Sequence, residues 1–403
     1  MAAESSLPMA GVRVLDIATF IAAPMAAAIL SEFGADVIKI EQPGAGDPWR
    51  RYGTKSKRDD STLAWLTEAR NKRSVTLNLR APEGAEIFKK LVAEADVVTE
   101  NFRPGTLEKW GLGYDVLSAI NPGLILLRVS GYGQTGPYRD RPGFARIAHA
   151  FGGLTHLAGM PGGPPVTPGS TSLGDYMTGM YGAIGVLMAL RERDRSGLGQ
   201  VVDLALYDSV FRVLDELAPA YAATGYVRGR EGIGTANACP HGHFECGDGR
   251  WVAIACTSDK MFERLARAMG RPELAAADAY GGVAARLKER ETVDALVSAW
   301  TGGMDREAVI SACVAAEVPI GAVNAIDEIF ADPHFAAREN LVTIDDPETG
   351  PVTVPAATPR LSRTPGRVAS LGPALASANE DVFKGLLGLT DADLAALRDK
   401  GVI

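Results

Sequence analysis

The sequence has few cysteines, no hydrophobic run of membrane-spanning length and no excess of positive charge. Four cysteines in 403 residues are too few and too scattered for a disulfide framework, which favours a reducing cytoplasm. No apolar run reaches the roughly 20 residues of a membrane-spanning helix, and no basic signal-peptide region is evident. A formal charge of -8 argues against a nucleic-acid or membrane-surface binder. We therefore expect a cytoplasmic protein that acts on a small molecule.

Three common catalytic and nucleotide-binding motifs are also missing. The first predicted strand-to-helix turn, residues 18–24, contains no G-x-G-x-x-G, so a dinucleotide site is unsupported. No Walker sequence is present for nucleotide hydrolysis. Neither Ser130 nor Ser172 lies in a G-x-S-x-G elbow, which argues against a serine hydrolase.

The pattern that is present alternates strands with helices. Apolar runs bounded by turn residues predict buried strands, and helical periodicity separates them. This alternation predicts an α/β fold with a mostly parallel sheet, a Rossmann-like arrangement that binds ligands at the carboxyl ends of its strands. The predicted strands are 12–17, 37–41, 74–79, 96–102 and 124–129.

The composition changes beyond Ala222, where a glycine-rich connection follows. We predict a large domain that the chain leaves and re-enters, and a smaller α/β domain between two linkers. The predicted segments are 1–205 for the N-terminal part of the large domain, 206–235 for a linker, 236–325 for the small domain, 326–350 for a second linker, and 351–403 for the return to the large domain.

One carboxylate, Asp175, stands between a Gly/Pro-rich loop and a long apolar segment. Residues 176–193 are apolar nearly all round, which predicts a buried helix. The helix dipole and the unpaired N–H groups at its start favour an ionised carboxylate, so Asp175 is a candidate nucleophile. The alternative is that Asp175 only caps the helix, as Asp commonly does.

Several segments in a fixed order resemble the class III CoA-transferases, the CaiB/BaiF family that includes formyl-CoA transferase and carnitine CoA-transferase. The resemblance covers most of the chain and implies that Asp175 attacks an acyl thioester. It further implies an aspartyl mixed anhydride, an enzyme–CoA thioester, and two copies interlocked as a homodimer, with acyl-CoA and a small carboxylic acid as partners. The matching segments are 7–16, 34–41, 71–74, 96–105, 130–133, 175–179 and 196–208.

The resemblance also selects positions for binding coenzyme A, all of them in 1–205. CoA needs apolar surface, scattered basic groups and a tunnel for its pantetheine arm. Each basic residue taken alone could equally be an ordinary surface side chain. The positions that match the family's CoA contacts are Ile21, Ala22, Gln42, Leu77, Asn78, Arg80, Asn101, Phe102, Arg103, Lys109, Arg141 and Phe144.

Departures from the family pattern bear on the substrate. Ile21 replaces a Gln of the formyl-CoA enzymes, Gln42 replaces an Arg, and Ala145 replaces an acidic residue. Phe144 stands where related racemases have a His, which weakens the alternative of a 2-methylacyl-CoA racemase, although His149 lies one helical turn and a residue further on. The segment 240–259 is most similar to members that handle C4 to C5 dicarboxylates, by mesaconyl-CoA C1–C4 transfer or from succinyl-CoA. A non-catalytic CoA-binding subunit is a further alternative.

Two histidines and two cysteines lie close together at Cys239, His241, His243 and Cys246. They invite a zinc site, but on a strand Cys246 would point away from the other three, and no second cluster exists. We therefore expect no metal. His241 or His243 could instead donate to the distal carboxylate of a dicarboxylic acid, or both could be ordinary loop residues.

Overall fold

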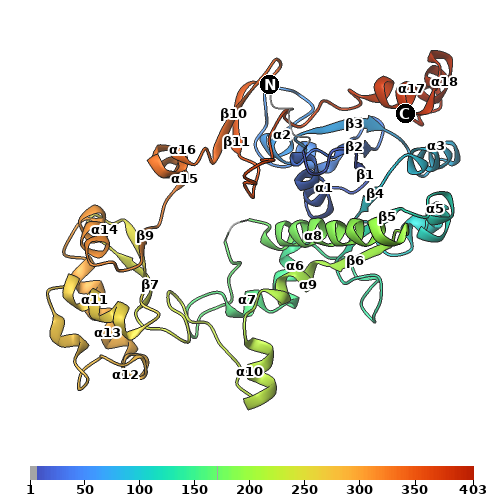
Figure 1. The fold of residues 1–403 in the computed structure, drawn as a ribbon. Helices are drawn as coiled ribbons and strands as arrows, with labels where there is room; N and C mark the ends of the chain where they lie inside the picture. Colours follow the sequence, from blue (N-terminus) through green and yellow to red (C-terminus); the bar gives the residue numbers. More distant parts are fainter. Residues whose placement is uncertain (1–6, 170) are drawn as a thin grey trace. The chain divides into compact units, whose positions relative to one another are not determined.

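The computed structural model describes residues 7–169 and 171–403, which form two compact units (Figure 1). Unit 1 combines three stretches of chain, through Leu154, from Gly169 to Asp215, and from Ala336 to Ile403. Unit 2 comprises Thr155–Pro168 and Glu216–Phe335. The chain thus leaves unit 1 and returns to it.

Unit 1 is built on a six-stranded sheet in the order β3-β2-β1-β4-β5-β6, with every pair parallel. This is the strand order of the Rossmann fold, in which ligands bind where the order reverses, here between β1 and β4. The α/β fold with a mostly parallel sheet is therefore confirmed. The strands are β1 (Arg13–Asp16), β2 (Asp36–Glu41), β3 (Lys72–Thr76), β4 (Val97–Glu100), β5 (Ile125–Ser130) and β6 (Val201–Ala205).

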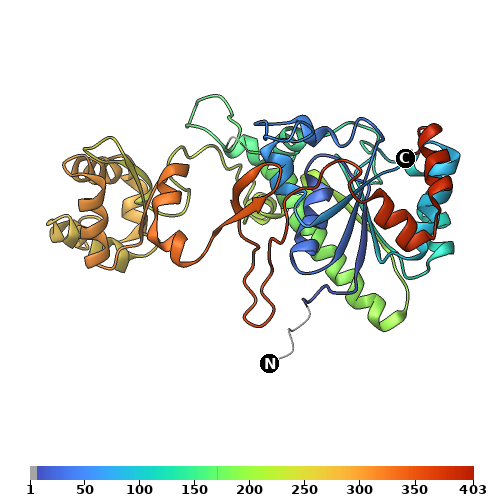
Figure 2. The ribbon, with the colours of Figure 1, turned by 90° about the horizontal axis from the view of Figure 1, so that it is seen from above.

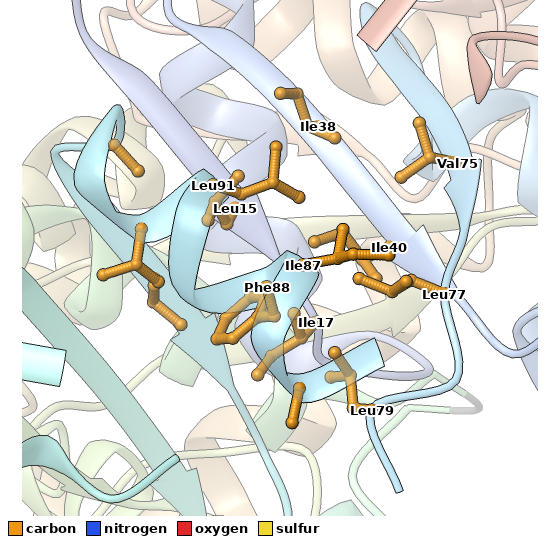
Figure 3. Packing of buried hydrophobic residues seen from close by; sticks show 14 of the residues in the cluster. Leu15, Ile17, Ile38, Ile40, Val75, Leu77, Leu79, Ile87, Phe88 and Leu91 are labelled. Atoms are coloured by element: carbon orange, nitrogen blue, oxygen red, sulfur yellow. The ribbon is translucent and has the colours of Figure 1, made fainter. Parts of the chain in front are cut away.

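Helices cover both faces of the sheet. Side chains that alternate along each strand are therefore buried on one face or the other. Leu15 packs on one face with Phe88 and Leu91 of α3 (Figure 3), whereas Val14 packs on the other with α1. Figure 2 shows α8 in green on one side of the strands and the C-terminal helices in red on the other. The first face is covered by α3 (Pro82–Ala93), α5 (Tyr114–Ile120), α17 (Asn379–Leu387) and α18 (Asp391–Asp399), and the second by α1 (Ala22–Glu32), α8 (Leu173–Ser196) and α9 (Leu206–Arg212).

Small residues bring α1 and α8 into close contact. A Cβ added at Gly179 would lie 2.6 Å from the Cβ of Met25, and one at Gly182 would lie 3.3 Å from the Cβ of Ala26. On the α1 side, Ala22, Ala26 and their neighbours are equally small. This packing places the first turn of α8, and with it Asp175, beside the start of α1.

Within the single chain, α8 is not the helix buried all round that the sequence predicts. Met180, Ile184, Leu187 and Met188 are exposed, with 44% or more of each residue accessible. Most glycine and alanine residues of α8 are buried together with Val186 and Leu190, while these four larger residues point outward. The composition of the segment alone does not distinguish these two faces.

The remaining elements extend unit 1 and form unit 2. Unit 2 has a three-stranded antiparallel sheet in the order β7-β8-β9.

Among the described residues no helix is both long and apolar enough to cross a membrane. In unit 1 the further elements are η1 (Pro48–Arg51), α2 (Leu63–Glu68), α4 (Thr106–Lys109), α6 (Ala145–Phe151), β10 (Leu341–Asp346) and β11 (Gly350–Pro355); α7 (Leu154–Leu157) and α16 (Pro333–Ala337) lie at the unit boundaries.

Residues 206–235, expected to be a linker, contain α9 and α10 (Leu217–Thr224), and residues 326–350 contain α15 (Ile326–Ala331) and β10. The division into five segments stays a prediction. The other elements of unit 2 are β7 (His241–Glu245), β8 (Trp251–Ala255), α11 (Asp259–Ala268), η2 (Pro272–Ala275), α12 (Val283–Lys288), α13 (Arg290–Thr301), α14 (Arg306–Ala315) and β9 (Ile320–Ala322).

Candidate active site

A cavity of about 240 Å³ opens at the carboxyl ends of β1, β4 and β5, and Asp175 lies in its wall. This is the edge where a sheet of this strand order places its ligands. We call it the Asp175 cavity. Its wall is formed by Thr19, Phe20, Ile21, Ala22, Asn101, Phe102, Arg103, Pro104, Val129, Ser130, Gly131, Arg141, Pro142, Gly143, Phe144, Asp175 and Leu206.

Asp175 is the third residue of α8 and does not cap it. The N-cap residue is Ser172, whose carbonyl oxygen accepts the Asp175 N–H at 2.9 Å. In the described part of the chain, no hydrogen bond or ion pair reaches the Asp175 carboxylate. The alternative of a simple helix cap is therefore wrong, and the carboxylate faces the cavity without a bound partner from the protein.

Burial raises the pKa of Asp175 to about 6. The sequence favours an ionised carboxylate through the helix dipole, but the loss of solvation outweighs that effect here. A pKa near 6 leaves most of the carboxyl groups ionised at pH 7. It also makes the ionised form more basic than an exposed aspartate, which suits a nucleophile.

The turn between β1 and α1 is held by side chains from other elements. Asn101 accepts the Thr19 N–H at 2.8 Å and donates to the Thr19 carbonyl at 2.7 Å. The buried Asp47 accepts the N–H of Phe20 at 3.1 Å. Phe20 has a φ of 62°, a left-handed conformation that costs a non-glycine residue roughly 1–2 kcal/mol. The hydrogen bonds fix this strained residue against the cavity.

The amides of Ile21 and Ala22 follow this turn and have no acceptor within the described residues. No side chain caps α1, and Pro24 contributes no N–H. The N–H groups of Gly152 and Gly153, at the end of α6, differ from these because both are already bound. Their N–H groups donate to Ala148 at 2.8 Å and Ala150 at 3.4 Å. Amides that face developing negative charge are the usual donors in acyl transfer.

A second cavity of about 220 Å³ adjoins the first, because Thr19 and Phe102 line both. Arg80 and Trp110 line this second cavity and also a larger groove of about 790 Å³. The groove has a mixed lining, with the basic Arg80, Lys89, Lys90 and Lys109 and the acidic Glu83, Glu86 and Asp393. The three spaces share wall residues in this order, from the Asp175 cavity to the surface groove, and together we call them the path.

The structure brings most of the predicted CoA positions onto this path. Asn78 is the exception, since it lines none of the three spaces, but its Oδ1 accepts the Arg80 N–H at 3.2 Å. The Asp175 cavity takes Ile21, Ala22, Asn101, Phe102, Arg103, Arg141 and Phe144; the second cavity takes Gln42, Leu77 and Arg80; and the basic groove takes Lys109. Their roles in binding stay predictions.

His241 and His243 belong to unit 2, on β7. His243 is exposed, whereas His241 is partly buried. Cys239 and Cys246 are both buried, and the Cys239 thiol donates to the Asp294 carboxylate at 3.6 Å. Across residues 7–169 and 171–403, no group of three or more His, Cys, Asp or Glu side chains is arranged to hold a metal ion.

Sequence reasoning missed three residues that shape the site. Phe20 and Trp110 line the path, and Asp47 fixes the turn before α1. The only sequence signal for Asp47 is its place in a Gly/Pro-rich loop after a predicted strand. That signal does not tell which backbone group the carboxylate will bind.

Comparison with known proteins gives a consistent result. A family model described as CoA-transferase family III matches residues 9–379. The chain is 58% identical over 401 residues to the beta subunit of a succinyl-CoA–L-malate CoA-transferase from Chloroflexus aurantiacus, covering 99% of each chain. It is 54% identical over 400 residues to an alpha subunit of the same name and organism, covering 99% of this chain and 94% of that one.

Two further similarities extend this result. A succinyl-CoA–D-citramalate CoA-transferase from the same organism is 44% identical over 396 residues, covering 98% of each chain. A crystal structure of a CaiB/BaiF family protein from Brucella suis superposes with a TM-score of 0.84 at 34% identity. That match covers 95% of this chain and all of the other.

Proposed function

The chain belongs to family III of the CoA-transferases and is an enzyme of that type, and on that premise we propose that Asp175 carries the transferred groups. The observation that supports this most directly is a largely desolvated carboxylate, without a partner among the described residues, in the wall of a cavity at the carboxyl ends of the strands. The proposed substrates are an acyl-CoA and a small dicarboxylic acid.

The proposed reaction conserves the energy of the thioester at each step. A carboxylate oxygen of Asp175 attacks the thioester carbonyl, the C–S bond breaks, and CoA leaves as a thiolate, giving a mixed anhydride. The thiolate then attacks the aspartyl carbonyl and releases the donor acid, which leaves an enzyme–CoA thioester. The acceptor carboxylate repeats these two steps in reverse and regenerates Asp175. No proton is gained or lost overall.

The path through unit 1 suits the shape and charge of CoA. The thioester would lie in the Asp175 cavity, and the neutral pantetheine arm would pass Phe102 and Leu77 in the second cavity. The phosphates would lie by Arg80 and Lys109, two of the basic residues that line the groove. The amides of Ile21 and Ala22 would then face the carbonyl oxygen of the thioester, which becomes the oxyanion when Asp175 attacks.

The dicarboxylate part of the proposal is supported by the relatives, whose names give succinyl-CoA with L-malate or D-citramalate. Succinyl-CoA is accordingly the proposed donor, with a C4 or C5 dicarboxylate as acceptor. Transfer between C1 and C4 of mesaconyl-CoA is the intramolecular form of the same chemistry. His241 and His243 are proposed to bind the distal carboxylate.

We also propose an interlocked homodimer in the cytoplasm. The exposed aliphatic residues of α8 support a second chain covering that face, because contiguous apolar surface usually marks an interface. Two of the relatives are named as alpha and beta subunits. The alternative is therefore a hetero-oligomer with a related chain. Light scattering on the purified chain, alone and at several concentrations, would distinguish a dimer from a monomer.

Mass spectrometry of the covalent intermediate tests the proposed role of Asp175. The protein is mixed with succinyl-CoA or mesaconyl-CoA, treated with hydroxylamine or borohydride, and digested. We expect a modified peptide that contains Asp175, and none in the Asp175→Asn variant. Asp194→Asn, an exposed change on the same helix, is the control and should label normally.

Two results would contradict the proposal. One is full CoA transfer by the Asp175→Asn variant. The other is exchange of an α-proton of 2-methylacyl-CoA with deuterated water, without transfer to any acid, which would indicate a racemase. A chain that binds CoA but forms no adduct with any of these thioesters would instead be a non-catalytic subunit.

A further inference from the structure

A buried histidine contacts the backbone immediately before Asp175. His149 lies on α6 and is only 1% exposed. Its Nε2 accepts the N–H of Gly174 at 2.7 Å. Because a backbone amide can only donate, Nε2 carries no proton, and the ring is neutral with its proton on Nδ1. Burial and the nearby Arg146 also hold the pKa of His149 below its usual value.

This contact replaces a cap at the start of α8. Gly174 is in the first turn, where backbone N–H groups have no acceptor within the helix. The side chain of the N-cap residue, Ser172, makes no capping hydrogen bond. The carbonyl of Gly174 accepts the Thr178 hydroxyl at 2.7 Å. Both ends of this residue are therefore held, and the next residue is Asp175.

The close approach of the ring depends on glycine. A Cβ at position 174 would lie 3.1 Å from both Cδ2 and Nε2 of His149. The opposite ring atom, Nδ1, is buried and has no hydrogen-bond partner within residues 7–169 and 171–403. An apolar side chain would avoid burying that donor, so packing alone does not account for a histidine here.

We propose that His149 is a positioning residue whose Nε2 holds the first turn of α8, so that the Asp175 carboxylate points into its cavity. The proposal rests on the proposed function of Asp175. Misplacing a nucleophile by about 1 Å can lower its rate on the order of 100-fold. The effect should appear in the rate of acylation and not in the binding of CoA, because His149 lines none of the three spaces.

Two substitutions separate positioning from packing. His149→Gln can place an amide oxygen near the position of Nε2, whereas His149→Leu fills the space without an acceptor. In single-turnover acylation by succinyl-CoA, we expect His149→Leu to be about 10- to 100-fold slower. In steady-state assays, its KM for succinyl-CoA should change less than about threefold. We expect His149→Gln to stay within about threefold of the wild-type rate.

Hydrogen exchange of the amides of residues 171–178 provides a readout independent of activity. Exchange should become faster in His149→Leu and stay near wild type in His149→Gln. If wild type forms no adduct at Asp175, the proposed function fails, and the exchange comparison alone decides whether His149 holds this turn.

The proposal is overturned if His149→Leu acylates at the wild-type rate, or if both variants lose the same activity and protection. Should His149→Leu fail to fold, His149→Met provides a second apolar side chain for the same comparison.

Discussion

A largely desolvated carboxylate without a partner among the described residues should cost this protein stability, and the cost can be measured by replacing Asp175 with Asn. Burial raises the pKa of Asp175 from 3.8 to about 6. A shift of about two pKa units corresponds to about 3 kcal/mol, as an upper estimate. The folded state thus binds a proton more tightly than the unfolded state. Asn imitates the protonated form and avoids the cost.

The expected difference depends on pH in a defined direction. Below the unfolded pKa, both states of the wild type are protonated, so Asp175→Asn and wild type should be equally stable. The advantage of the variant should grow as pH rises from about 4 to 6 and stay constant above that. Urea unfolding at pH 4, 5, 6 and 7.5 would measure it.

The control is Asp194→Asn, an exposed change on the same helix, which should alter stability by less than about 0.5 kcal/mol at every pH. The reasoning is refuted if Asp175→Asn is no more stable than wild type at pH 7.5, or if its advantage is equally large at pH 4. Either result would mean that the carboxylate is well solvated or paired in the folded protein.

Three further predictions concern packing, binding and the turn at the site. Gly179→Ala should destabilise by about 1–3 kcal/mol in urea, because its Cβ would lie 2.6 Å from a side-chain carbon of α1. Gly385→Ala, with open space around its Cβ, should be neutral or stabilising. Arg80→Ala should raise KM for succinyl-CoA about tenfold at unchanged kcat, and should not affect a succinyl-pantetheine thioester. Asp47→Ala should destabilise by about 3 kcal/mol, because it removes the 3.0 Å ion pair of the buried Lys39, and Asp47→Asn should cost less.

The alternating strands and helices of unit 1 could be predicted because their signals are local. Val14 and Leu15 are both apolar since one faces each side of the sheet, and that run reads directly as a buried strand. The same logic fails for α8. Gly179 and Ala183 are buried there while Ile184 and Leu187 are exposed, which inverts the usual relation between size and burial.

The site could be predicted only in part, because its geometry comes from residues distant in sequence. The resemblance selects Asn101 and Arg80, and both lie on the path from Asp175. It does not reveal that Asp47 accepts a hydrogen bond from the N–H of Phe20, nor that His149 accepts one from the N–H of Gly174. These contacts join segments 25 and 27 residues apart, and their side chains have no distinguishing local pattern.

The raised pKa of Asp175 and the absence of a partner in the described residues serve the same chemical end. A nearby cation would lower the pKa and stabilise the ionised form, but it would also weaken the carboxylate as a nucleophile toward a thioester. A pKa much above 7 would leave too little of it ionised at neutral pH. A largely desolvated carboxylate with a pKa near 6 satisfies both conditions. On the proposed function its position then has to be fixed through the backbone, and the hydrogen bond from Gly174 to the neutral His149 is proposed to do this without placing a charge beside the carboxylate.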